Sequence, residues 1–357
     1  MNIQQISRSF IHLPIAAAAM AVAAIAVIPQ RSVAQREGSG AWRIQWIDDG
    51  DKIQLSFEDY DRDGGRSSTG YTVALSSLQG LSPSQLRGSS SHAHFQLKRD
   101  AGTFNFDGRV GNNRGAGQFG FTADPRFGAQ LASRGYSRPD AHEQFQMAMH
   151  DVGFALIDEL KSQGYGRTSI DDLITMGEHG VHYDYVHALG QLGYRLHDTA
   201  ALVDLRDHGV TPAFITGLSK LGYNKLGADQ LLELRDHGVT PSYVTAMHDA
   251  GYKNLKADDL LELRDHGVSK DYVSSLMALG YTNLTTDDLL TARDHGVTSS
   301  FAEGFKKLGY TSVSLNQLVK LRDHGVTPDF ASRVRAREGS GVSIQELINR
   351  RDSGDRY

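Results

Sequence analysis

A 29-residue period runs through the C-terminal two-thirds of this 357-residue chain and limits what it can fold into. The tripeptide His-Gly-Val recurs at this spacing, and a Gly-Tyr pair keeps the same period. Self-similarity at such a period is typical of repeat architectures. We count about eight units between residues 124 and 353. The histidines of the six tripeptides are His179, His208, His237, His266, His295 and His324.

Each unit predicts two short helices. In one unit, Thr211 caps the first helix and Pro212 takes the first helical position, where its missing N–H costs nothing. Apolar residues follow at helical spacing, and Gly222 ends the helix in a left-handed conformation. The second helix begins with a capping box, such as Thr285 with Asp288. It ends in Arg-Asp-His-Gly, which places cationic groups at the negative end of the helix dipole.

Helices of about ten residues do not persist alone, so each unit must bury its apolar stripe against its neighbours. The predicted architecture is therefore a stacked helical solenoid. The final unit replaces Gly-Tyr by Glu338-Gly339 and is rich in arginine. A polar last unit is what a cap on the open end of a solenoid requires.

Residues 41–122 change to a period of two, which is typical of half-buried strands. The alternating apolar residues are Trp42, Ile44, Trp46, Ile53, Leu55, Phe57, Tyr71, Val73, Leu75, Phe95, Leu97, Phe104, Phe106, Phe119 and Phe121. Turn signals at Asp63-Gly64-Gly65, Asp107-Gly108 and Asn112-Asn113 separate the runs. We expect a small antiparallel β domain of about six strands. Since the first repeat helix should start at Asp124, we expect no linker and an α+β protein packed as one body.

Residues 1–34 resemble an export signal. Arg8 precedes an apolar run from Ile11 to Ile28, and Ser32-Val33-Ala34 supplies the small residues that a signal peptidase needs. The alternative is a retained anchor, since the run approaches the length of a spanning helix. Pro14 and the alanine-rich composition favour cleavage. Either way we expect an exported, periplasmic or extracellular protein, with membrane contact only through an uncleaved N-terminal segment.

Composition excludes some chemistry. The chain has no cysteine, so it carries no disulfide, thiolate metal site or thiol nucleophile. Its 37 basic and 42 acidic residues are mixed throughout and give a net charge of −5. Because no basic block stands out, nucleic acid is not an expected partner.

One segment of the β domain has the carboxylate spacing of a calcium loop. Asp59, Asp61 and Asp63 alternate as in its first half, where side-chain oxygens converge on a hard cation. The bidentate acid expected at the twelfth position is replaced by Gly70. An aspartate-rich hairpin turn explains the same residues without metal. Calcium is therefore an alternative, and we expect no other cofactor.

The histidines give a second metal hypothesis. One histidine per unit could form a metal ladder or a pH-sensitive stack. However, successive histidines belong to different units, and capping at a helix C-terminus explains them equally. His92 and His94 share one face of a predicted strand, opposite Phe95 and Leu97, which indicates the solvent face of the sheet.

Two stretches match enzyme motifs in part but lack the neighbouring structure or ligands that each motif requires. Gly115 to Gly120 matches G-x-G-x-x-G, but Phe119 and Phe121 alternate as a strand where a dinucleotide site needs a helix. His142-Glu143 begins like H-E-x-x-H, yet the second ligand position is Gln146. Glu143 instead completes a capping box with Asp140. We therefore expect no enzyme active site.

The units LRDHGVTPxF/Y, followed by GY and a DDLL helix, resemble the helical repeats found C-terminal to the membrane core of some bacterial BlaR/MecR-type antirepressor metallopeptidases and in related exported proteins. The stretches AGTFNFDG, GAGQFGF and DPRFGAQLASRGY resemble the segment that introduces those repeats. The chain lacks that family's multi-span membrane domain and its H-E-x-x-H motif. The resemblance therefore implies only an extracytoplasmic sensing or interaction module, and no catalytic residue carries over.

These observations favour an exported, non-enzymatic module that binds a protein or peptide. Its candidate surface is a stripe of Arg-Asp pairs, one per unit, although a stripe of alternating charge is also typical of a solvated, self-paired face. The alternatives are a metal-dependent sensor and an enzyme in the β domain, whose mark would be a buried acid or histidine in a cleft. The stripe comprises Arg206, Asp207, Arg235, Asp236, Arg264, Asp265, Arg293, Asp294, Arg322 and Asp323.

Overall fold

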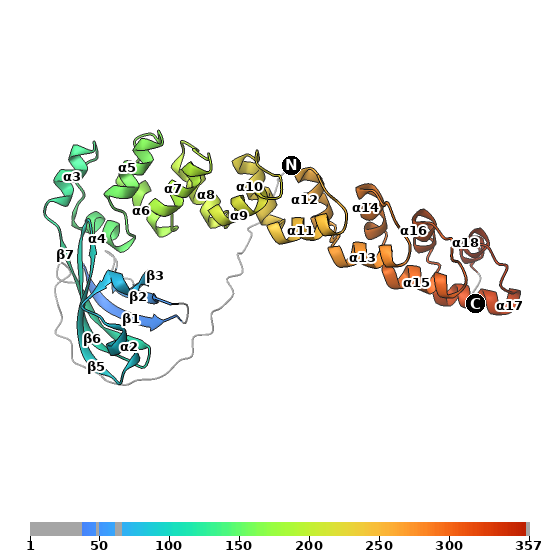
Figure 1. The fold of residues 1–357 in the computed structure, drawn as a ribbon, viewed down its shortest axis with the longest axis horizontal. Coiled ribbons are helices and arrows are strands. Elements are labelled where there is room, and N and C mark those ends of the chain that lie inside the picture. The colour runs from blue at the N-terminus through green and yellow to red at the C-terminus, as the bar shows by residue number, and fades with distance from the viewer. Residues whose placement is uncertain (1–37, 48–49, 61–65, 355–357) are drawn as a thin grey trace, which may run out of the picture.

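The structure is a computed structural model that describes residues 38–47, 50–60 and 66–354. A curled antiparallel sheet forms the N-terminal part, and a long series of helices extends from it, as predicted for an α+β chain (Figure 1). The predicted signal segment, residues 1–34, lies outside the described residues. Among the helices that the structure describes, none is long and apolar enough to cross a membrane.

Seven strands form one sheet in the order β3-β2-β1-β7-β6-β5-β4, with every neighbouring pair antiparallel. All six predicted strands are present. The seventh, β4, is only two residues long and precedes a short helix, α2 (Pro83–Arg87). The strands are β1 (Ser39–Trp46), β2 (Lys52–Tyr60), β3 (Arg66–Ala74), β4 (Leu78–Gln79), β5 (Ser91–Arg99), β6 (Gly102–Gly111) and β7 (Arg114–Ala123).

The concave side of the sheet holds an aromatic core centred on Trp42. This side chain is 1% exposed, and its indole N–H lies 3.2 Å from the carbonyl of Asp107 and 3.0 Å from that of Gln118. A Cβ on Gly117 would fall 2.0 Å from the Asp107 carbonyl, and one on Gly108 would fall 2.7 Å from the Trp42 ring. The glycines are therefore required by the close approach of the neighbouring strand and of the indole.

The predicted turn at Asp107-Gly108 is wrong, because both residues lie inside the continuous strand β6. The predicted turn at Asn112-Asn113 is confirmed: both asparagines have positive φ, 54° and 63°, between β6 and β7. The glycines of the G-x-G-x-x-G motif lie in β7 as sheet residues, and the same close packing explains Gly115 and Gly117 but not Gly120, where a Cβ would meet nothing within 4 Å.

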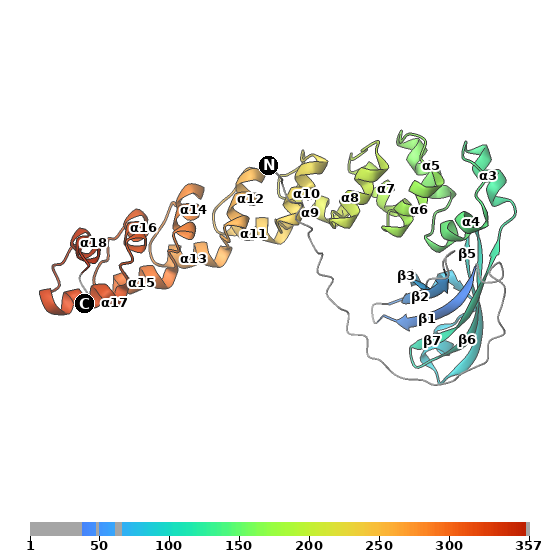
Figure 2. The same cartoon turned by 180° about the vertical axis from the view of Figure 1, so that it is seen from behind.

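Sixteen helices follow within the described residues, two for each 29-residue unit. In Figures 1 and 2, the first helices of successive units form one row and the second helices form another. They are α3 (Phe127–Ser133), α4 (Ala141–Met149), α5 (Phe154–Ser162), α6 (Ile170–Glu178), α7 (Tyr183–Gln191), α8 (Thr199–Asp207), α9 (Pro212–Ser219), α10 (Ala228–Asp236), α11 (Pro241–Asp249), α12 (Ala257–Asp265), α13 (Lys270–Ala278), α14 (Thr286–Asp294), α15 (Ser299–Lys307), α16 (Leu315–Asp323), α17 (Pro328–Glu338) and α18 (Ile344–Asp352).

The predicted helix signals are confirmed. Thr211 caps α9 by accepting from the Phe214 N–H, with Pro212 at the first helical position. Gly222 ends the helix with φ of 101°, and the capping box of Thr285 with Asp288 opens α14. These local bonds satisfy backbone groups that a helix end leaves without partners.

Sheet and array share one continuous hydrophobic core. Strand β7 ends at Ala123 and α3 begins at Phe127, three residues later than predicted, because Asp124 and the two residues after it form a turn. On α4, the Phe145 ring lies 5.5 Å from that of Phe121 and 6.1 Å from that of Phe104. Burial of these rings fixes the first unit against the sheet.

Candidate functional site

A row of histidine-aspartate pairs joins successive units. The imidazole Nδ1 of each histidine lies 2.5 to 2.9 Å from a carboxylate oxygen 28 residues later in the chain. We call this row the His-Asp ridge. Its pairs are His179–Asp207, His208–Asp236, His237–Asp265, His266–Asp294, His295–Asp323 and His324–Asp352.

The separation of 28 residues between each histidine and its aspartate follows from their positions in the unit. Each histidine is the C-cap of its second helix, and each aspartate is the last residue of the second helix in the next unit. Stacking at a 29-residue period brings them together. Their side chains are 39–50% exposed, so a neighbouring molecule can reach them. The hydrogen bond that the His266 ring donates to the Asp294 carboxylate raises the pKa of His266 above its ordinary value.

The arginines of the predicted stripe reach back to the first helix of their own unit. Each guanidinium lies over an aromatic ring on that helix, with its central carbon 5.1 to 5.5 Å from the ring centroid. The two residues of an Arg-Asp pair therefore make different contacts. The arginine lies over an aromatic ring, whereas the aspartate accepts a hydrogen bond from a histidine. The stacked pairs of the stripe are Arg206–Tyr185, Arg235–Phe214, Arg264–Tyr243, Arg293–Tyr272 and Arg322–Phe301. Arg351, outside the predicted stripe, lies over Phe330 in the same way.

The first step of the row differs from the others. His150 lies 3.7 Å from Glu178, which occupies the place of the aspartate in the second unit. The His150 side chain is only 10% exposed, and burial lowers its pKa to about 4. Asp151 follows with φ of 56°, at the place that glycine takes in later units. The end of the row nearest the sheet is therefore neutral and buried, unlike the exposed ridge.

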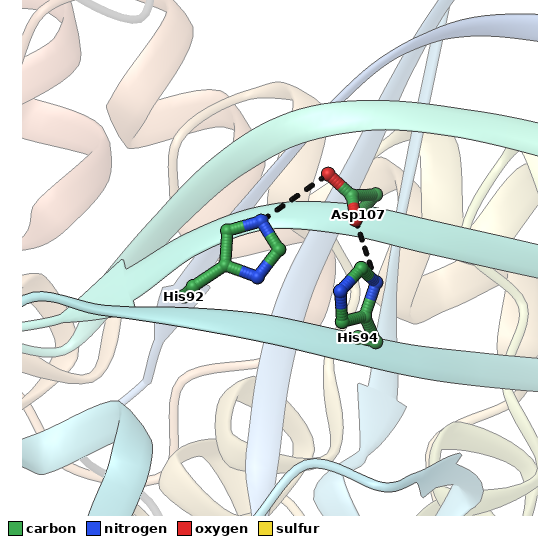
Figure 3. A group of neighbouring side chains, drawn as sticks. All are labelled: His92, His94 and Asp107. Atoms are coloured by element: carbon green, nitrogen blue, oxygen red, sulfur yellow. Dashed lines mark ion pairs between the residues drawn. The ribbon is translucent and has the colours of Figure 1, made fainter.

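Three polar side chains gather on the outer face of the sheet. His92 and His94 lie on β5, and Asp107 faces His94 directly across on β6 (Figure 3). One carboxylate oxygen lies 3.4 Å from His92 Nε2 and the other 2.6 Å from His94 Nδ1. The burial pattern of β5 alternates and leaves both histidines exposed, as predicted for the solvent face.

The aspartates of the calcium hypothesis fall at the edge of the described part of the chain. The backbone of Asp59 lies near the end of β2, whereas Asp61 and Asp63 lie outside the described residues. The calcium site therefore stays a prediction.

A polar cluster lies where the sheet meets the array. Arg99, at the end of β5, forms an ion pair of 2.6 Å with Asp151, beside a cavity of about 290 Å³. Burial lowers the pKa of nearby His182, the N-cap of α7. The enzyme alternative requires a buried acid or histidine in a cleft, but His182 is half-buried and does not line this cavity. Among the described residues that line it, no nucleophile is hydrogen-bonded to a base. The ion pair is explained as an attachment of the sheet to the array.

Replacing Asp100 by alanine is expected to loosen this attachment. The Asp100 carboxylate accepts the Phe154 N–H at 2.7 Å and so caps α5, whose own N-cap is Gly153. Loss of a capping carboxylate costs about 1 kcal/mol. Hydrogen exchange of α5 amides checks this, with faster exchange expected in the variant; unchanged exchange would contradict it. Replacing Asp158, which is exposed on the same helix, would not serve as a control for this substitution, because Asp158 forms an ion pair with Arg134.

Comparison of the chain with models of protein families, with curated proteins and with solved structures found no match.

Proposed function

We propose that the protein is an exported, non-enzymatic module that binds a protein or peptide along the His-Asp ridge. One observation carries the proposal: the ridge presents the same half-exposed pair once per unit, in register along the array. Tandem helical units generate extended surfaces of this kind, which suit elongated partners. Export rests on the character of residues 1–34.

The chemistry of each pair indicates what the partner must supply. A carboxylate only accepts hydrogen bonds, so the Nδ1 atom of the paired histidine donates. In the neutral ring this leaves Nε2 as an acceptor. Each unit therefore offers acceptors on both the imidazole and the carboxylate. The favoured partner is a segment with regularly spaced donors, such as lysine, arginine or free backbone N–H groups.

The test neutralises the ridge without changing its shape. A variant carrying Asp236→Asn, Asp265→Asn and Asp294→Asn keeps an oxygen that accepts the histidine N–H, but loses three negative charges. The matched control carries Asp229→Asn, Asp258→Asn and Asp287→Asn, which are exposed in the first turns of α10, α12 and α14. Both variants lose the same charge from the same units.

The three proteins are compared as baits on extracytoplasmic extract, and any captured protein is purified and titrated against each bait. We expect the parent and the control to bind the partner alike and the ridge variant to bind it at least about tenfold more weakly, a loss of about 1.4 kcal/mol. Circular dichroism verifies that all three are folded. Equal binding by all three, or capture of nothing, would remove the ridge as the binding surface.

A further inference from the structure

We propose that His92, His94 and Asp107 form a binding site for a divalent transition metal ion, best suited to Zn²⁺, on the outer face of the sheet. Each residue offers one ligand atom, and these atoms all lie within 4.8 Å of one another. Imidazole nitrogen and carboxylate oxygen are ligands that zinc prefers. Figure 3 shows the two rings and the carboxylate turned toward one another.

The spacing already approaches that of a coordination shell. Zinc ligands at about 2.0–2.2 Å in a tetrahedron lie about 3.3–3.6 Å apart. His92 Nε2 and the Asp107 oxygen are 3.4 Å apart. His94 Nδ1 is closer to the carboxylate, at 2.6 Å, because a proton joins them in place of a metal ion. Exchanging that proton for the ion needs only small side-chain movements.

The backbone holds these side chains in place. His92 and His94 are two residues apart on one strand, and Asp107 is the cross-strand partner of His94. Because side chains alternate along a pleated strand, all three lie on the same face of the sheet. Beneath them, the Trp42 indole donates to the Asp107 carbonyl and fixes that part of β6. A site built on packed strands is more precise than one on a loop.

A cross-strand arginine does not compete for the carboxylate. Arg109 faces His92 across the two strands, and its guanidinium donates to the side chain and carbonyl of Ser90 rather than to Asp107. The side chains of His92, His94 and Asp107 are 54%, 72% and 57% exposed. With three protein ligands, the fourth position of a tetrahedral ion stays open to water or to a group from another molecule.

The test titrates the full-length chain, carrying no polyhistidine tag, with Zn²⁺ by calorimetry in metal-free buffer near neutral pH. We expect one strongly bound Zn²⁺ per chain. His94→Ala and Asp107→Asn should each weaken binding by roughly tenfold to 100-fold. Because these side chains are exposed, the variants should fold, which circular dichroism verifies.

The control variant is His197→Asn, at an exposed histidine between α7 and α8 whose Nδ1 lies 3.2 Å from the Gly164 carbonyl and whose positive φ asparagine tolerates. It should bind Zn²⁺ like the parent. Absence of Zn²⁺ binding, or equal binding by the parent and the His94→Ala and Asp107→Asn variants, would overturn the proposal. Loss of the ion from His197→Asn alone would also overturn it, because the ion would then lie on the helical array.

Discussion

Replacing Leu263 by alanine is expected to lower the free energy of unfolding by about 3 kcal/mol, within the range of about 2–5 kcal/mol for a buried leucine. Leu263 lies on α12, near the middle of the array, and is 0% exposed. Truncation leaves a cavity between units and removes contacts that each short helix needs in order to persist. Urea denaturation followed by circular dichroism measures the loss.

The preceding residue supplies the control for this prediction. Glu262 is exposed on the same helix, and Glu262→Ala should change stability by no more than about 0.5 kcal/mol. Because each unit contacts only its neighbours, the cavity should also let the two halves of the array unfold separately. Hydrogen exchange would then show lower protection at the fifth unit and beside it. Equal effects of the two substitutions would mean that this helix is not held by burial of its apolar stripe.

The features predicted correctly from the sequence depend on near neighbours in the chain. The Thr211 cap, the left-handed Gly222 and the Thr285 capping box each depend on a few consecutive residues. The alternation of β1 likewise follows from its own sequence. By contrast, β4 is only Leu78–Gln79, too short to show a period. Asp107-Gly108 has the composition of a turn, but pairing with β5 on one side and β7 on the other keeps it extended.

The candidate sites were harder to predict because they depend on contacts between units or strands. Asp207 and His179 are 28 residues apart, a separation visible in the repeat as one less than the period. Only the way in which units stack decides that these residues meet. The exposed face of His92 and His94 was predicted from alternation. The neighbour of His94 on β6 was missed because Asp107 was assigned to a turn, and strand register is not local.

Lowering the pH from about 7 to about 4 is expected to destabilise the first unit through His150. Burial lowers the pKa of this histidine from 6.5 to about 4. Below pH 6.5 the unfolded chain therefore binds a proton at His150 that the folded chain does not bind. The free energy of unfolding falls as the pH drops toward the pKa of the folded state. A pKa shift of this size corresponds to a full loss of about 3 kcal/mol in the free energy of unfolding.

The groups around His150 modify this effect without changing its sign. Glu178, 3.7 Å away, favours the charged ring, but its side chain is 47% exposed and well solvated. His182 also has a pKa lowered by burial, so it adds acid sensitivity in the same direction. His266, whose pKa is raised, acts in the opposite pH range: its contribution is present below pH 6.5 and is lost as the pH rises through its folded pKa.

A comparison of the parent with His150→Asn isolates the contribution of this one ring. Urea denaturation of both proteins near pH 7 and near pH 4.5 gives two differences in unfolding free energy, and carboxylates that titrate in both proteins cancel between them. The variant loses packing at both pH values, but the parent should lose about 2 to 3 kcal/mol more than the variant on acidification. Histidine NMR signals supply an independent check, because the His150 ring should stay neutral at a pH where His266, whose pKa is raised, carries a proton. If His150 titrates together with His266, the junction between sheet and array is more hydrated than the 10% exposure of the His150 side chain indicates, and the acid lability must come from elsewhere in the chain.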